Sequence, residues 1–108
     1  PRWRTQKKVD VHITDFLSLD PTQPPYSHAQ SVLLDPSCSG SGIIERSGAV
    51  GSDDGAGAEE IDPERLRGLA AMQLRLLLHA LRFPAATRVT YSTCSVHTLE
   101  NEVVAIAA

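Results

Sequence analysis

The sequence predicts an α/β fold with a mainly parallel sheet, and three observations lead to this fold class. Segments typical of strands and helices follow one another in the order strand, loop, strand, helix, strand, helix, which favours parallel strands joined by right-handed crossovers. Residues 31–36 include a run of successive apolar positions, as expected for a strand buried on both faces. Small polar loops follow the strands, at the edge where parallel sheets bind their ligands.

The chain is expected to begin with a strand and a loop. Apolar residues alternate with polar ones over residues 9–13, which predicts a strand that ends at Asp15. Residues 18–30 are rich in Pro, Ser, Asp and Gln and are expected to form a loop. The second strand, residues 31–36, ends at an Asp-Pro turn signal.

Two glycine-containing loops follow the second strand. Residues 36–42 are expected to form a tight loop that needs backbone freedom at Gly40 and Gly42. Residues 45–61 are rich in Gly, Asp and Glu and are expected to form a flexible acidic surface loop. The order and spacing of the acidic residues in this second loop match no metal-binding arrangement.

A long helix is predicted after the acidic loop. Asp62 is a capping carboxylate, and Pro63 suits the first helical position. The Phe-Pro pair at residues 83–84 ends the helix. Its apolar face lies at helical spacing and consists of Leu66, Ala70, Leu74, Leu77, Leu78 and Leu81.

The last part of the chain is predicted to contain a strand and a helix. Residues 87–92 are rich in β-branched side chains and form the strand. A small polar loop, residues 93–95, comes directly after it. Thr98 is expected to cap the final helix, which has glutamates in its first turn and an apolar face of valine and isoleucine.

Composition limits the chain to one small domain. It has 108 residues, of which 42% are hydrophobic, and it has no apolar run of the roughly 18 residues that a membrane span needs. The formal net charge is −3, so the whole chain produces no field that attracts a polyanion. Basic residues near the N-terminus form either a solvated tip or a strip that contacts nucleic-acid phosphates: Arg2, Arg4, Lys7 and Lys8. The missing initiator Met suggests a fragment or a processed chain.

The chemistry of the chain is expected at two cysteines. Cys38 and Cys94 each follow a predicted strand, and Asp15 and Asp35 also lie at strand ends, so these segments are expected to converge on one pocket. A thiol in front of a helix is exposed to the positive end of the helix dipole, which lowers its pKa and favours the reactive thiolate. Hydroxyl side chains flank both cysteines. This combination suits nucleophilic catalysis.

Three other interpretations of the cysteines remain open. Free cysteines are often buried and only pack in a core. A redox disulfide is disfavoured because the two residues are far apart in the sequence and not in a Cys-x-x-Cys arrangement. Zinc is disfavoured because the two cysteines and four scattered histidines show no ligand spacing, and we expect no metal.

Two motifs resemble signatures of a known enzyme family. Residues 32–42 (VLLDPSCSGSG) and 91–95 (YSTCS) are similar to two signature motifs of the Nop/Sun-domain RNA cytosine-5 methyltransferases. Residues 100–102 (Glu-Asn-Glu) also fit the family. Most members read Asp-x-Pro-Cys in the first motif. The Asp-Pro-Ser-Cys of this chain resembles the fifth member of the family, which implies modification of large-subunit ribosomal RNA.

The resemblance implies a fold, a reaction and roles for individual residues. The fold would be part of a Rossmann-like, S-adenosyl-L-methionine-dependent methyltransferase domain, with residues 1–108 as its C-terminal part. Cys94 would be the nucleophile that adds to carbon 6 of cytosine, and Cys38 would help to release the product. Asp35 would lie between cofactor and target base, and Asp15 near the cofactor adenine. The location implied is the nucleus and nucleolus.

The resemblance also limits what is expected of the chain alone. No Gly-rich strand-to-helix turn precedes Asp15, although family members carry such a cofactor loop. We therefore expect the chain by itself to be inactive. The alternative from another class is a non-catalytic module that binds RNA or assembling ribosomes and keeps the same fold.

Overall fold

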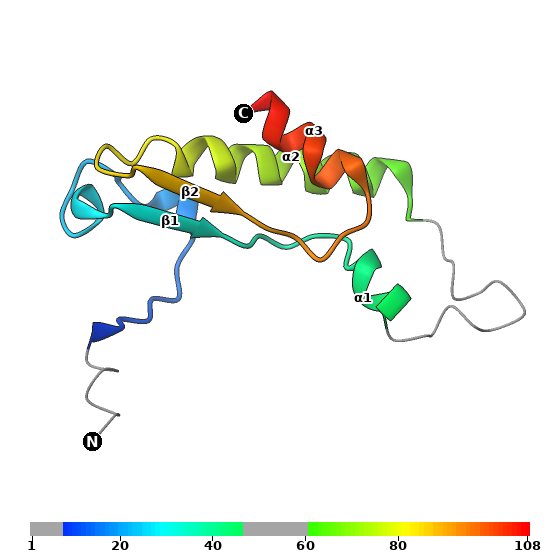
Figure 1. Ribbon diagram of the computed structural model, residues 1–108, viewed down its shortest axis with the longest axis horizontal. Helices are drawn as coiled ribbons and strands as arrows, with labels where there is room; N and C mark the ends of the chain where they lie inside the picture. The colour runs from blue at the N-terminus through cyan, green and yellow to red at the C-terminus, as the bar shows by residue number, and fades with distance from the viewer. Residues whose placement is uncertain (1–7, 47–60) are drawn as a thin grey trace, which may run out of the picture.

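The computed structural model describes residues 8–46 and 61–108. Three 3-10 turns, two strands and three helices make up its elements in these ranges (Figure 1). In chain order they are η2 (Phe16–Ser18), η3 (Tyr26–His28), β1 (Ser31–Leu34), α1 (Ser41–Arg46), α2 (Pro63–Ala80), β2 (Arg88–Tyr91), η6 (Thr98–Glu100) and α3 (Glu102–Ala107).

The two strands form a parallel pair, as predicted. The register aligns Ser31 with Arg88 at the start of the pair and Leu34 with Tyr91 at its end. A backbone hydrogen bond of 3.0 Å, from the Ser92 N–H to the Leu34 carbonyl, continues the ladder beyond the last pair. Because parallel strands run in the same direction, the loops after β1 and β2 leave the sheet at the same edge.

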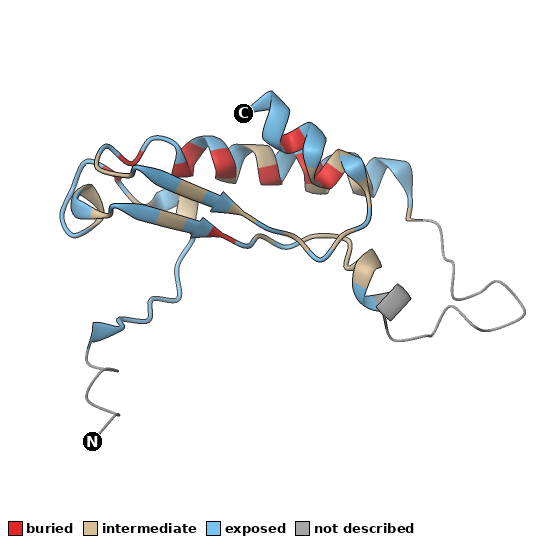
Figure 2. Cartoon of the chain, in the orientation of Figure 1, coloured by how far each residue is buried: buried red, intermediate tan, exposed pale blue. Residues whose placement is uncertain are grey.

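Helix α2 covers one face of this small sheet, and α3 packs against α2. The core contains Leu34 of β1, Leu77 of α2 and Val104 of α3, all nearly inaccessible to solvent. Figure 2 shows the buried positions mainly along α2 and on α3, whereas the strands are largely exposed or half-buried. Leu33, next to Leu34, is 74% exposed. The prediction that this strand is buried on both faces is therefore wrong for the described part of the chain, where helices pack on one face only.

The predicted first strand does not form. Residues 9–13 have no strand structure, and Val9, Val11 and Ile13 are 67%, 84% and 103% exposed. A period-2 pattern produces a strand only when a neighbouring strand accepts its hydrogen bonds. In the ranges that the structure covers, β1 and β2 pair only with each other. The prediction that Asp15 lies at the end of a strand is wrong for the same reason.

The long helix matches its sequence signals. The Asp62 carboxylate accepts a hydrogen bond of 3.1 Å from the Glu64 N–H, and Pro63 is the first helical residue. The apolar face is narrower than predicted, because Leu78 and Leu81 are 43% and 51% exposed. Gln73, a polar residue, is completely buried within this face.

Two helix boundaries differ from the predictions. The chain turns into α1 at Ser41, so the loop after β1 is shorter than residues 36–42. Thr98 does not cap the last helix: it begins the 3-10 turn η6, and α3 starts only at Glu102. Most of the predicted acidic loop, residues 45–61, and most of the basic N-terminal cluster lie outside the described residues. No helix within the described ranges is both long and apolar enough to cross a membrane.

Candidate functional site

The two cysteines lie together at the edge of the sheet where both strands end. Cys38 follows β1 and Cys94 follows β2, and their Sγ atoms are 3.1 Å apart although the residues are separated by 56 positions in the sequence. Neither thiol is in a disulfide, and Cys94 is exposed to solvent. The predicted convergence is thus confirmed for the two loops that carry the cysteines, whereas Asp15 caps the separate turn η2. The core-packing interpretation is wrong for Cys94, because its side chain faces solvent.

The backbones of the two cysteine loops are in direct contact. The Gly42 N–H donates a hydrogen bond of 2.8 Å to the carbonyl of Cys94. A Cβ atom at Gly42 would lie 2.7 Å from that carbonyl oxygen, which is too close for any side chain. Gly40 has a φ of +72°, a left-handed conformation that favours glycine. The predicted need for backbone freedom is confirmed at Gly40, whereas Gly42 is required for a different reason, the close approach of the Cys94 carbonyl.

Hydrogen bonds of serine hydroxyls connect the two cysteine loops. The Ser39 hydroxyl donates to Ser41 Oγ at 3.2 Å and lies 3.3 Å from Ser95 Oγ. Ser41 Oγ also accepts a hydrogen bond of 2.9 Å from the Val96 N–H. The hydroxyls of Ser39 and Ser41 thus connect the two loops, whereas the Ser95 hydroxyl donates to the carboxylate of Glu100.

The carboxylate of Glu100 lies buried beneath the two loops. Its side chain is 0% exposed, and its oxygens accept hydrogen bonds from the Ser39 N–H at 2.9 Å, Gln73 Nε2 at 2.8 Å and the Ser95 hydroxyl at 2.6 Å. Burial by itself would raise the pKa of Glu100. The hydrogen bonds outweigh this effect and hold its pKa below the ordinary value. Glu100 is therefore a buried anion near neutral pH.

Residues from α2 and β2 complete the surroundings of Glu100. Besides contacting Glu100, Gln73 Nε2 donates a hydrogen bond of 3.0 Å to the carbonyl of Ser37. The Tyr91 hydroxyl donates one of 2.6 Å to the backbone carbonyl of Glu100. Burial, the charge of Glu100 and the nearby Cys38 together raise the pKa of Tyr91 to about 12. Tyr91 therefore stays protonated and acts as a donor.

The side chain of Asn101 makes hydrogen bonds to three residues in and after the Cys94 loop. Its Oδ1 accepts a hydrogen bond from the Thr93 hydroxyl. Its Nδ2 donates to the carbonyls of Ser95 and His97 at 3.0 and 2.9 Å. Glu100 and Asn101, two neighbours in the sequence, thus hold the loop around Cys94 from both ends.

The environment does not activate the Cys94 thiol in this state. The hydrogen bond to Cys38, partial desolvation and the nearby charge of Asp35 raise the pKa of Cys94 above its ordinary value. The expectation of a lowered pKa at this strand end is not met for Cys94. The physical reason is the neighbouring Cys38 thiol, whose hydrogen bond to the Cys94 sulfur makes the largest contribution to the shift.

The two predicted acidic residues have different positions. Asp35 is exposed directly after β1, and its Oδ1 accepts a hydrogen bond of 3.3 Å from the Ser92 hydroxyl, so it belongs to the cysteine edge. Asp15 caps η2 by accepting a hydrogen bond of 3.0 Å from the Leu17 N–H. Its recorded partners are Leu17 and Ser18 of its own turn. A role for either aspartate in cofactor binding stays a prediction.

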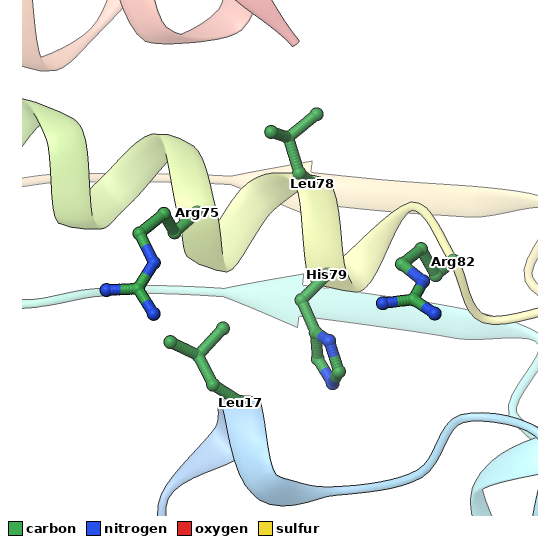
Figure 3. A pocket seen from close by; sticks show the side chains of 5 residues that line it. All are labelled: Leu17, Arg75, Leu78, His79 and Arg82. Carbon is green, nitrogen blue, oxygen red and sulfur yellow. The ribbon is translucent and has the colours of Figure 1, made fainter.

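A hollow elsewhere on the surface does not include the cysteines. It has a volume of about 290 Å³ and is lined by Leu17, Arg75, Leu78, His79 and Arg82. Figure 3 shows Leu17 of η2 facing His79 of α2, with the two arginines on either side. Among residues 8–46 and 61–108, no three His, Cys, Asp or Glu side chains lie close enough to hold a metal ion.

Sequence reasoning missed the residues that support the cysteines. Glu100 was predicted only as a residue of the first helical turn and of a family motif, and Gln73 was not predicted to be part of the site. One signal for Gln73 was present, since it is a polar residue three positions from Ala70 and four from Leu77 on the apolar face. No local pattern shows that the Glu100 carboxylate turns inward.

Comparison with known proteins finds relatives that match most of this chain. It is 47% identical over 94 residues to the 25S rRNA (cytosine-C(5))-methyltransferase rcm1 of Schizosaccharomyces pombe, 49% over 88 residues to a 28S rRNA (cytosine-C(5))-methyltransferase of Mus musculus, and 48% over 100 residues to the putative methyltransferase NSUN5C of Homo sapiens. The chain is homologous to the NSUN5 family of rRNA cytosine-C5 methyltransferases. No family model matches the chain.

The NSUN5-family alignments cover nearly all of this chain but a small part of each relative. They include 87%, 82% and 93% of the chain, and 20%, 18% and 30% of the three relatives. The resemblance seen in the two cysteine motifs is therefore confirmed at the level of the family. The chain corresponds to about a fifth of the length of the first two NSUN5-family relatives.

Proposed function

We propose that the chain supplies the two-cysteine part of the active site of an S-adenosyl-L-methionine-dependent RNA cytosine-5 methyltransferase that acts on large-subunit ribosomal RNA. The observation that carries the proposal is the pair of thiols, 3.1 Å apart, presented by two adjacent parallel strands. The names of the homologous proteins, which are rRNA cytosine-C(5)-methyltransferases, support the substrate class. In the full-length protein we propose a Rossmann-like fold and a nucleolar location.

Cys94 is assigned the first chemical step. Carbon 5 of cytosine is a poor nucleophile, and addition of a thiolate at carbon 6 converts the ring into an enamine-like species that is nucleophilic at carbon 5. The exposed position of Cys94 allows a base extruded from its stack to approach. Because Cys38 raises the pKa of Cys94, the addition step requires that the Cys94 thiol first lose its proton.

Cys38 and Asp35 are assigned to the later steps. After methylation, a base removes the carbon-5 proton, the ring double bond re-forms and the bond between Cys94 and carbon 6 breaks. Cys38 lies beside the sulfur that leaves, which suits a role in this release. Asp35 lies at the same edge, and by resemblance it would lie between the cofactor and the target base.

The residues present are compatible with the methyl donor. Asp35 is an exposed carboxylate at the end of β1, the type of group that attracts a cationic sulfonium compound, and no basic side chain is among its recorded partners. S-adenosyl-L-methionine, when bound, supplies an electrophilic methyl group. Asp35, and by resemblance Asp15, would hold it. The Gly42 contact and the serine hydroxyls keep the loops beside it in place.

The two cysteines are distinguished by an adduct assay in the full-length protein that carries these residues. Cys94→Ala is expected to abolish both methyl transfer and any covalent RNA adduct. Cys38→Ala is expected to allow addition and transfer but slow release, so that protein stays attached to labelled RNA on a denaturing gel. Adduct with Cys94→Ala but not with Cys38→Ala would reverse the two roles. Unchanged activity for both variants would contradict the proposal.

A second candidate, a thiol redox protein, is favoured by the short distance between the sulfur atoms. The large separation in sequence argued against it, but the fold removes that separation. The two functions differ in what they require of RNA. A redox protein would cycle between thiols and disulfide with no need for RNA or a methyl donor, whereas the methyltransferase would transfer labelled methyl groups to ribosomal RNA only while both thiols are reduced.

A further inference from the structure

We propose that Glu100 is a positioning residue whose buried carboxylate sets the separation of Cys38 and Cys94. The catalytic part of this inference rests on the proposed function, but the geometric part does not. No contact between Glu100 and either sulfur is recorded, so its action would pass through the residues that follow each cysteine.

The carboxylate connects three segments that are distant in sequence. Ser39, the residue after Cys38, donates its backbone N–H to Oε2, and Ser95, the residue after Cys94, donates its hydroxyl to Oε1. Gln73 from α2 donates to Oε2 as well. Each cysteine is therefore one residue away from a hydrogen bond to the same side chain, and α2 holds that side chain in place.

The burial of Glu100 indicates that this arrangement is specific. A carboxylate without solvent contact is costly to bury, and the three recorded donors around it are uncharged. Hydrogen bonds to a charged acceptor are shorter and stronger than neutral ones. Rearranging either loop would leave part of a buried anion unsatisfied, which restricts how far the loops can separate.

The geometry predicts an unusual order among substitutions. Glu100→Gln keeps the length of the side chain: its oxygen can accept from Ser39 and Gln73, and its amide can donate to the Ser95 hydroxyl. Glu100→Asp keeps the charge but is shorter by about 1.5 Å, so it cannot reach both loops. A positioning role predicts that Gln functions better than Asp. A role through charge or proton transfer predicts the opposite order.

The first readout measures the distance between the thiols without using catalysis. Full-length protein is treated with diamide, which takes two electrons and two protons from the two thiols to give a disulfide and the reduced hydrazine. Peptide mass spectrometry then follows the Cys38–Cys94 cross-link. We expect a rate within about threefold of wild type for Glu100→Gln, and losses of about 10-fold for Glu100→Asp and 100-fold for Glu100→Ala.

Two controls separate positioning from general effects. Glu102→Gln removes an exposed carboxylate two residues away and should leave the cross-linking rate unchanged. Val104→Ala leaves a cavity in the core beneath α3, because Val104 is 3% exposed. This variant should lower the melting temperature without slowing cross-linking at 25 °C. The proposal would be overturned if Val104→Ala slowed cross-linking as much as Glu100→Ala, or if Glu100→Asp cross-linked faster than Glu100→Gln.

The second readout is methyl transfer to ribosomal RNA by the same variants. The turnover number should follow the order wild type, Gln, Asp, Ala, while the KM for RNA stays within about threefold, because the RNA contacts are not altered. A larger change in KM than in kcat would overturn the positioning role. If wild-type protein transfers no methyl group, the proposed function fails, while the order of cross-linking rates still decides the role of Glu100.

Discussion

The two ends of the parallel sheet are stabilised in different ways. Where the strands begin, Phe16 stacks on Phe83 with ring centroids 5.6 Å apart, and both rings meet His79 edge-on. His79 Nε2 donates a hydrogen bond of 3.0 Å to the carbonyl of Leu19. Where the strands end, the groups in contact are thiols, serine hydroxyls, an amide and the Glu100 carboxylate.

This difference indicates which end serves stability and which serves the site. Aromatic packing removes a large apolar area from water and tolerates small displacements. A hydrogen-bonded network contributes less net stability but accepts only a narrow range of geometries. We therefore expect substitutions at the aromatic end to change the free energy of unfolding, and substitutions at the cysteine end to change mainly the position and reactivity of the thiols.

The largest expected effect on stability is at Phe83. Its ring is 5% exposed, so Phe83→Ala should lower the free energy of unfolding by about 3–5 kcal/mol. Urea unfolding monitored by circular dichroism measures this change. Leu81→Ala is the matched control, because Leu81 is 51% exposed and should change stability by less than about 0.5 kcal/mol. Equal effects for the two variants would show that the aromatic cluster is not what stabilises this end.

Two glycine substitutions test the cysteine end. Gly42→Ala places a Cβ atom 2.7 Å from the Cys94 carbonyl, so the loops must separate. We expect methyl transfer to fall about 100-fold, with a loss of stability of about 1–3 kcal/mol. Gly68→Ala on α2 meets no atom within 4 Å and should instead stabilise the helix by about 0.5–1 kcal/mol without affecting activity. Activity of Gly42→Ala equal to wild type would contradict the close approach of the loops.

The smallest expected effect is a shift in the pH at which the Cys94 thiol ionises. Because Cys38 raises the pKa of Cys94 in the folded protein, the thiolate of Cys94 forms at higher pH than in an ordinary thiol. Cys38→Ala removes the main cause, so the pH midpoint of Cys94 alkylation by iodoacetamide should move down. Asp35→Asn, which removes the smallest cause, should give a smaller shift in the same direction. An upward shift with Cys38→Ala would show that Cys38 favours the thiolate instead.

Local sequence signals identified much of this architecture. The Asp62-Pro63 start of α2, the strands around residues 31–34 and 88–91, and the need for glycine at position 40 all follow from short-range preferences, and the structure confirms them. The cysteine motifs also predicted that the two thiols lie together, because parallel strands bring the loops that follow them to one edge. These features depend on a few consecutive residues or on the direction of the strands.

Other features depend on which segments become neighbours, and the sequence alone does not determine them. The alternation over residues 9–13 is typical of a strand, but no strand forms there because β1 and β2 pair only with each other in the described chain. Glu100 has the same local signals as Glu102, yet it is fully buried while Glu102 is exposed. Donors from Ser39, Gln73 and Ser95 stabilise the charge of Glu100 once the chain has folded. The sequence placed the two thiols at one edge, and the tertiary hydrogen bonds decided how close they lie.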